Sequence, residues 1–307
     1  MNKLVVSASP HIRTQESVRS IMWAVVLALV PAGAVGVWVF GLRALGVIGV
    51  SLASALFFEA AVQRLRGQKI TLSDGSAFLT GLLLSYNLPS NVPLWLPVAG
   101  SFVAIVIAKQ AFGGLGRNIF NPALVGRAFL LASWPGHMTT FSAPFDILTR
   151  ATPLAMLKEG HVADLAAMKV SYFDLLFGLR GGCIGEVCVV ALLLGALFLW
   201  WRKIISCYAP LVFISVVAGL SWAFAGPQAF SGDAIFAALS GGLVLGAFFM
   251  ATDYVTTPLT AKGQAIFGLG CGLLTFVIRQ WGGYPEGVSY SILMMNAAVP
   301  LIDRWVN

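Results

Sequence analysis

The stretch Ser73–Leu94, SDGSAFLTGLLLSYNLPSNVPL, has a counterpart at Ala238–Leu259, ALSGGLVLGAFFMATDYVTTPL. Each stretch is apolar, contains small residues, and leads through Pro-Leu into a second apolar segment that ends in a base, Lys109 or Arg279. Gly-rich segments follow both bases, and then Asn121 and Asn296 stand in comparable places. The correspondence indicates an internal duplication, although small-residue helix packing alone can produce part of such a similarity.

The composition around this repeat is that of an integral membrane protein. Of 307 residues, 58% are hydrophobic and only 10% are charged, and the mean hydropathy is +0.87. A helix that crosses a bilayer needs roughly 20 apolar residues. We predict ten spans: Ser20–Phe40, Ala44–Val62, Asp74–Leu88, Val92–Ala108, Asn118–Trp134, Ile184–Trp201, Ile204–Ala225, Ala234–Ala251, Gln264–Arg279 and Val288–Asp303.

Ten spans and a duplication predict an all-α polytopic protein made of two five-span repeats that are inverted in the membrane. Residues 1–134 form the first repeat, 135–183 an extracytoplasmic loop, and 184–307 the second repeat. Inverted repeats commonly hold a ligand at their interface, between interrupted helices. The first span is too long and begins too late for a cleaved signal peptide, so we expect the N-terminus to be retained.

The net charge of +7 follows from topology and does not indicate a nucleic-acid partner. With a cytoplasmic N-terminus, twelve of the nineteen Lys and Arg residues fall on inner segments, six on outer segments, and Arg127 within a span. Four of the outer six lie in the long loop, which carries little weight in the positive-inside rule. Both termini are therefore predicted to be cytoplasmic.

Metal and nucleotide motifs are absent from the sequence. The four cysteines, Cys183, Cys188, Cys207 and Cys271, form no CxxC pair, and the three histidines are scattered. This spacing predicts neither a zinc nor an iron–sulfur site, and single cysteines of this kind usually pack as small hydrophobes. No GxGxxG follows a strand and no P-loop occurs, so we expect no NAD or nucleoside triphosphate site.

Several polar residues lie inside the predicted spans, where facing lipid would be costly. They are Glu59, Asp74, Asn87, Arg127, Glu186, Asp253 and Asn296. We expect them to face the bundle interior, although those near a span end can instead extend to the membrane interface. Asp253, in FMATDYVTTP, and Asn121, in RNIFNPA, adjoin breaks that free backbone polar groups.

The long loop contains a more polar passage, FDILTRATPLAML, from Phe145 to Leu157. Within it, Thr152 followed by Pro153 is typical of a helix start, with Thr as the N-cap and Pro at the first helical position.

Six motifs in order carry a family resemblance: SASPH, DGSAFLTGLLL, GGLGRNIFNPALVGRAFL, DILTRATPLA, GGLVLGAFFMATDYVTTP and GGYPEGVSYSILMMNAAVPLIDR. Along nearly its whole length the chain resembles the RnfD component of the Rnf complex and, more distantly, the NqrB component of the sodium-translocating NADH:quinone oxidoreductase. The resemblance implies a urea-channel-like fold in a bacterial or archaeal cytoplasmic (inner) membrane.

The resemblance also implies a covalent FMN, linked by a phosphoester to Thr152. The matching pattern is D-x-x-[ST]-x-A-T, completed by Asp146, Thr149 and Ala151, while Arg150 stands where such motifs often have Gly. Thr is a poor nucleophile alone and no neighbouring base is evident, so a separate flavin transferase is implied, working from FAD on the outer face. We predict no catalytic side chain, since the flavin supplies the redox chemistry.

Electrons, by the same resemblance, reach the FMN on Thr152 from an FMN-carrying neighbour in the complex and pass on to a non-covalent riboflavin nearer the cytoplasm. The whole complex couples electron transfer between ferredoxin and NAD to sodium or proton movement. Candidate ligands of the second flavin are Asn118, Asn121, Asp253 and Thr257, which cluster at helix breaks. Alternatively, these side chains simply satisfy backbone groups. Glu59, Asp74 and Glu186 are candidates for a cation pathway.

Two other classes remain open on the sequence alone. One is a secondary transporter or channel, which inverted repeats and broken helices would suit. The other is a cofactor-free membrane scaffold for redox partners. Flavin fluorescence in the denatured band on a gel is expected only for the flavoprotein.

Overall fold

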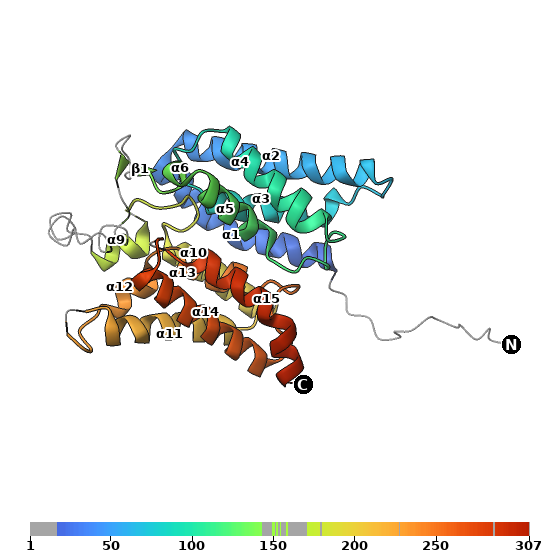
Figure 1. Ribbon diagram of the computed structural model, residues 1–307. Coiled ribbons are helices and arrows are strands. Elements are labelled where there is room, and N and C mark those ends of the chain that lie inside the picture. Colours follow the sequence, from blue (N-terminus) through green and yellow to red (C-terminus); the bar gives the residue numbers. More distant parts are fainter. Residues whose placement is uncertain are drawn as a thin grey trace.

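The computed structural model describes residues 17–142, 149–150, 152, 154, 158, 171–178, 180–226, 228–284 and 286–306. These residues form a bundle of helices with one very short strand pair (Figure 1). α1 begins and α15 ends at the same end of the bundle, which we call the terminal end; α6, β1, α9 and α12 lie at the opposite, loop end (Figure 1).

The first half contains α1 (Val18–Phe40), α2 (Leu42–Leu65), η1 (Leu72–Asp74), α3 (Ser76–Tyr86), α4 (Trp95–Phe102), η2 (Val103–Gln110) and α5 (Pro122–Ser133). α4 continues directly into η2, which is π-helical. Ser17 starts α1 through a reciprocal capping box with Ser20. Gly41 alone separates α1 from α2, and its φ of +72° is a conformation that Gly adopts at little cost.

Between the halves lie α6 (Pro135–Met138), β1 (Phe141–Ser142), β2 (Thr149–Arg150) and α9 (Tyr172–Phe177). β1 and β2 pair antiparallel, with Phe141 opposite Arg150. This strand pair departs from the all-α prediction, but it is confined to the connecting segment outside the membrane bundle.

The second half contains α10 (Val189–Trp201), α11 (Tyr208–Phe224), α12 (Ala234–Leu239), α13 (Leu243–Leu245), η3 (Gly246–Met250), α14 (Ala261–Trp281) and α15 (Val288–Val306). η3 continues α13 and is also π-helical. The largest hydrophobic core cluster joins both halves, because residues of α1 and α3 pack with residues of α10, η3, α14 and α15. Cys188 and Cys271 belong to this core, as expected of isolated cysteines.

All ten predicted spans contain helix, and the chain is a mostly helical, polytopic membrane protein. Among the described residues, α1, α2 and α14 are long and apolar enough to cross a membrane by length and composition. Shorter apolar helices include α3, α5, α10 and α11.

Two predicted spans were wrong as continuous helices. Ala234–Ala251 is interrupted between α12 and α13, where Gly241 and Gly242 both have φ of +66°. Ile184–Trp201 becomes helical only at Val189, because the residues before it form a turn bonded to the first half: the backbone N–H groups of Ile184 and Gly185 donate to the carbonyls of Leu88 and Tyr86, both at 3.0 Å.

Three residues predicted to lie within spans are therefore outside the helices that form them. Asp74 belongs to η1, just before α3. Glu186 lies in the turn before α10, and Asp253 follows η3 in the connection to α14. Hydropathy placed these residues with the spans because an apolar run adjoins each of them, although the break beside Asp253 was predicted from its neighbours.

The ends of the broken helices meet in the middle of the molecule. The Asn87 side chain at the end of α3 lies 3.7 Å from the Met250 sulfur at the end of η3. Asn121 Nδ2, at the start of α5, donates to the Met250 carbonyl at 3.4 Å. Asn296 of α15 lies here too: with its amide nitrogen toward the carbonyls of Ile292 and Thr256, its oxygen accepts from Asn121 N at 3.1 Å. The two repeat-related asparagines thus touch.

Candidate functional site: a central cavity between the two halves

A cavity lies between the halves, near the terminal end. Its walls come from α1, α3, η2 and α5 on one side, and from α10, η3 and the turn after η3 on the other. Most of the wall is apolar, with a few polar groups: Ser76, Thr80, Lys109, Asn118, Asn121, Thr252 and Asp253. A mostly apolar wall with a few polar groups is typical of small-molecule sites.

Asn118 and Asn121 both line the cavity but differ in how their side chains are hydrogen-bonded. Asn121 is the N-cap of α5, where its Oδ1 accepts from the backbone N–H groups of Ala123 and Leu124. Asn118 donates through Nδ2 to the Phe120 carbonyl at 3.1 Å, and within the described structure its Oδ1 accepts no hydrogen bond. Asn121 is therefore mainly structural, whereas Asn118 keeps an acceptor for a ligand.

Asp253 lines the same cavity from the second half. Its carboxylate receives only long hydrogen bonds, from Val255 N at 3.5 Å and from the Thr256 hydroxyl at 3.4 Å. Burial raises the pKa of Asp253 above its ordinary value. The carboxyl group thus retains most of its capacity to bond a ligand.

Thr257 was predicted with these three residues but does not line the central cavity. Its hydroxyl donates to the Ala251 carbonyl at 2.8 Å. It lines a neighbouring pocket of about 870 Å³, together with Lys203, Ser206 and Gln264. The two pockets share wall residues, including Ile204 and Thr252. The structure therefore brings three of the four predicted second-flavin ligands onto one cavity and leaves the fourth beside it.

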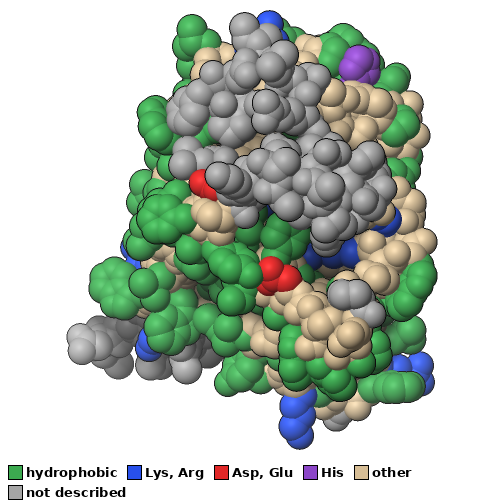
Figure 2. All heavy atoms as spheres, turned by 90° about the vertical axis from the view of Figure 1, so that its left-hand side faces the viewer, with side chains coloured by type: hydrophobic (Ala, Val, Ile, Leu, Met, Phe, Trp, Pro, Cys, Tyr) green, Lys and Arg blue, Asp and Glu red, His purple; other side chains and the backbone are tan. Residues whose placement is uncertain are grey.

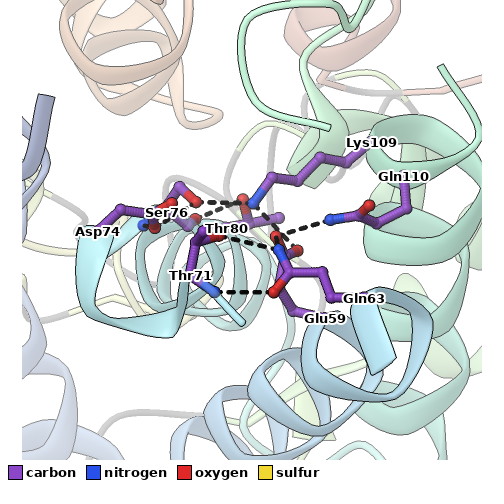
Figure 3. Close-up of polar contacts among 8 residues, drawn as sticks. All are labelled: Glu59, Gln63, Thr71, Asp74, Ser76, Thr80, Lys109 and Gln110. Atoms are coloured by element: carbon purple, nitrogen blue, oxygen red, sulfur yellow. Dashed lines mark hydrogen bonds and ion pairs between the residues drawn. The ribbon is translucent and has the colours of Figure 1, made fainter. Parts of the chain in front are cut away.

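Lys109, which lines the cavity, forms a buried ion pair with Glu59, which does not (Figure 3). Lys109 Nζ lies 3.1 Å from Glu59 Oε2, and both side chains are almost wholly buried. The second Glu59 oxygen accepts from Gln110 at 2.7 Å and from Gln63 at 3.1 Å. With its remaining lone pairs bonded in this way, a buried carboxylate is stable beside its cation.

The same lysine connects this pair to the start of α3 (Figure 3). Lys109 Nζ donates to Ser76 Oγ at 2.7 Å, and Ser76 Oγ donates to Asp74 Oδ1 at 2.7 Å. Thr80 donates to the Ser76 carbonyl at 2.9 Å. Glu59 and Asp74, both predicted as cation-pathway residues, are thus joined through Lys109 and Ser76. Whether a cation passes here stays a prediction.

A second group of buried charges lies toward the loop end, where Glu186 is found. Arg127 of α5 forms an ion pair with Glu286 and donates to Asn87 Oδ1 at 2.7 Å. Ligand atoms of Cys183, Glu186 and Glu286 lie within 4.8 Å of one another. Arg127 already neutralises Glu286, and Arg180 is hydrogen-bonded to the Glu186 carbonyl at 3.3 Å. Arg127 therefore neutralises Glu286, whereas among the described residues the Glu186 carboxylate accepts only from Cys183 N, at 2.9 Å.

Thr152 lies on the segment at the loop end and is buried, with 6% of its surface exposed. Leu154 and Lys158, which follow it, are helical, which agrees with the predicted helix start. Pro153, Asp146 and Ala151 lie outside the described residues, and so do the side chains of Thr149 and Arg150.

A cavity of about 1180 Å³ adjoins the Thr152 segment, and Leu154, Lys158, Asp233 and Arg279 line it. Lys158 Nζ donates to the carbonyls of Ile278 and Tyr284, at 3.0 and 2.9 Å. Arg279 likewise donates to carbonyls, among them Ala237 O at 2.7 Å. Figure 2, which looks onto this end, shows Lys or Arg atoms in a recess beside the grey residues. Both cations line this cavity and bond neutral carbonyls, so their charge is available to a phosphate-bearing group.

Sequence reasoning missed the cavity positions of Ser76 and Thr80 and the ion pairs of Lys109 and Arg127. The signal for Lys109 was present, because it is a lone cation at the end of the apolar run VAIVIAKQ. No local signal points to Glu286, which lies 159 residues from Arg127.

Comparisons with known proteins match the whole chain. The model of the NQR2, RnfD, RnfE family covers residues 5–307. The chain is 52% identical over 306 residues to the D component of the Na(+)-translocating ferredoxin:NAD(+) oxidoreductase complex of Acetobacterium woodii, covering 98% of this chain and 93% of the relative. It is 50% identical over 313 residues to the D component of the proton-translocating ferredoxin:NAD(+) oxidoreductase complex of Clostridium ljungdahlii, covering 99% and 95%.

A more distant relative also aligns along most of the chain. The D component of the ion-translocating oxidoreductase complex of Stutzerimonas stutzeri is 41% identical over 325 residues, which cover 94% of this chain and 91% of that protein.

Proposed function

Since the chain belongs to the NQR2, RnfD, RnfE family, we propose that it is the flavin-carrying membrane component of an ion-translocating ferredoxin:NAD oxidoreductase complex. The names of its relatives support the complex, and the buried polar groups between its helices support a redox or transport role. The single observation that carries the flavin assignment is the D-x-x-T-x-A-T pattern ending at Thr152, next to a cavity with two cations.

For the covalent flavin, Thr152 would supply the oxygen of the phosphoester to FMN. Lys158 and Arg279 would offset the phosphate charge, because both are cations bonded to carbonyls and not to carboxylates. Burial of Thr152 requires the segment to open for a flavin transferase before the group is attached.

For the second flavin, the central cavity is the proposed site. Asn118 Oδ1, Asp253 and the remaining N–H of Lys109 offer acceptors and a donor along an otherwise apolar wall. A carboxylate disfavours a phosphate, so this lining suits riboflavin better than FMN. Flavins exchange one or two electrons, so one flavin near each end would let the chain carry electrons through the membrane.

The wider architecture proposed here follows the repeat. Residues 1–134 and 184–307 are two inverted five-span repeats of urea-channel-like fold, joined by the extracytoplasmic segment 135–183, and both termini are cytoplasmic. The contact between Asn121 and Asn296 supports the repeat relation. Other proteins of the complex, one of them carrying FMN, would be the partners. Relatives named for Na⁺ and for protons are almost equally similar, so overall identity favours neither ion.

A secondary transporter with inverted repeats is the second candidate, because the central cavity lies between the two halves, where such proteins bind substrate. The presence of covalently bound flavin distinguishes the flavoprotein from the transporter. The wild-type chain, produced together with a flavin transferase, should give a fluorescent band after denaturation, and a colourless band would favour the transporter.

Thr152→Ala tests the attachment site. We expect the variant to insert normally but to lose covalent flavin, because the phosphoester oxygen is gone while a lost helix cap costs only about 1 kcal/mol. Thr149→Ala should keep the flavin, and Thr152→Ser, which retains a hydroxyl, should keep part of it. Mass spectrometry of the Thr152 peptide locates the group. Flavin that survives denaturation in Thr152→Ala, or that maps to Thr149, Thr256 or Thr257, would refute the site.

A further inference from the structure

A line of hydrogen bonds leads from the surface of the terminal end to the central cavity. Asp74, half-buried in η1, accepts from Ser76 Oγ at 2.7 Å. Ser76 is buried at the start of α3 and accepts from Lys109 Nζ at 2.7 Å. Ser76 and Lys109 both line the cavity. Three side chains thus connect a partly exposed carboxyl group with the cavity interior, without a gap longer than one hydrogen bond.

The position of Lys109 distinguishes this line from an ordinary buried ion pair. Its counter-ion Glu59 does not line the cavity and is held by Gln63 and Gln110 on the side away from it. An ammonium group has three N–H donors. Among the described residues two of them bond Glu59 and Ser76, so the third is available toward the cavity.

We propose that Asp74, Ser76 and Lys109 form a proton path that connects the aqueous surface at the terminal end with the ligand in the central cavity. The proposal rests on the function proposed above, in that a flavin occupies this cavity. It assigns to the three residues a role separate from ion translocation, namely the supply and removal of the protons that accompany reduction and oxidation of the ligand.

The three side chains can pass one proton to the cavity and each regain its own proton. Lys109 donates a proton from its ammonium group into the cavity and becomes an amine beside Glu59. The Ser76 hydroxyl proton then moves to the Lys109 amine, and Asp74, protonated by water at the surface, replaces the proton on Ser76. One proton from water enters the cavity and every side chain returns to its starting state. Oxidation of the ligand reverses each transfer.

One feature of the surroundings, the Glu59 carboxylate, favours transfer. Glu59 stays in contact with Lys109 throughout, so the ammonium form is restored after each transfer. The Thr80 hydroxyl donates only to the Ser76 backbone carbonyl and bonds none of the three side chains of the path. Asp253, on the other cavity wall, is the remaining described acid that faces the ligand space.

Ser76→Ala is the sharpest test, because it breaks the path while leaving the Lys109–Glu59 pair intact. A change at Lys109 would instead leave Glu59 buried and unpaired, and such a variant can fail to fold. The matched control is Thr80→Ala, which removes another hydroxyl from the same cavity wall but outside the path. Ser76→Thr keeps the relay oxygen.

The experiment uses the full chain carrying Thr152→Ala, so that only non-covalent flavin contributes. The protein is reduced with dithionite in a stopped-flow instrument, in weak buffer with a pH-indicator dye, and a reagent blank is subtracted. In the parent and in Thr80→Ala, proton uptake should keep pace with flavin bleaching. In Ser76→Ala, uptake should lag by at least about tenfold at unchanged flavin content, and Ser76→Thr should restore it.

The possible failures are distinct. Proton uptake in Ser76→Ala as fast as in the parent, at equal flavin content, would refute the path and leave the second flavin in place. A parent chain that releases no flavin on denaturation would refute the second flavin site, and the path would fall with it. Equal slowing in Thr80→Ala would show a general disturbance of the cavity and would also refute the path.

Discussion

Two buried cations, Lys109 and Arg127, are each stabilised by a carboxylate that is distant in the sequence. Lys109 pairs with Glu59, 50 residues away, and Arg127 pairs with Glu286, 159 residues away. Each cation also bonds a neutral group, Ser76 or Asn87. The first pair joins helices of one half, whereas the second joins the two halves. Loss of the second pair should therefore weaken the whole bundle.

Arg127→Met tests the pair between the halves. Removing the guanidinium leaves the Glu286 carboxylate without its partner, and breaking a buried pair in this way costs about 3–5 kcal/mol. We expect a clearly lower unfolding temperature in detergent. The control Arg202→Met, at an exposed cation, should change stability by less than about 1 kcal/mol. Adding Glu286→Gln to Arg127→Met should recover part of the lost stability. Equal unfolding temperatures for Arg127→Met and Arg202→Met would contradict the role of the pair.

At the scale of elements, glycines decide which helices pack closely. A Cβ added to Gly195 in α10 would lie 2.2 Å from the Ala28 carbonyl of α1. Small residues at such crossings let backbones approach, which is the main source of helix association in a membrane. Gly219 in α11, by contrast, has nothing within 4 Å of an added Cβ. These two helical glycines therefore make a matched pair.

Gly195→Ala should destabilise the bundle by about 1–3 kcal/mol, because α1 and α10 must move apart. Gly219→Ala should be neutral or stabilising by up to about 1 kcal/mol, since Ala is the better helix former. Thermal unfolding of the two variants in the same detergent checks both signs. If Gly195→Ala unfolds at the wild-type temperature, the close contact of α1 with α10 is not what holds these helices together.

At the scale of the whole molecule, α1 begins and α15 ends at one end of the bundle (Figure 1). An even number of crossings would produce this arrangement, and from the predicted excess of basic residues on that side we propose that it faces the cytoplasm.

Reporter fusions test the orientation. A fluorescent protein fused after Asn307 should be bright, because it folds in the cytoplasm, and alkaline phosphatase inserted after Thr140 should be active outside. The reciprocal fusions, phosphatase after Asn307 and fluorescent protein after Thr140, serve as controls and should be silent. An active phosphatase after Asn307 would mean that the number of crossings is odd.

What the sequence determined by itself was local in origin. Apolar content predicted a polytopic helical protein, and all ten predicted spans contain helix. Pro, Gly and Asn near Asn121 and Asp253 predicted helix breaks, and both residues do lie beside such breaks. These features depend on neighbours within a few positions, so a single sequence carries them.

The tertiary structure alone decided which polar residues meet. Asn118, Asn121 and Asp253 share one cavity while Thr257 faces the next, although Thr257 is only four residues from Asp253. The helix expected through Ser240 breaks because Gly241 and Gly242 adopt positive φ, and a Cβ at Gly242 would lie 2.4 Å from Glu186. Such pairings join residues from different helices. Their partners follow from how whole helices pack, and no local pattern of residues encodes that choice.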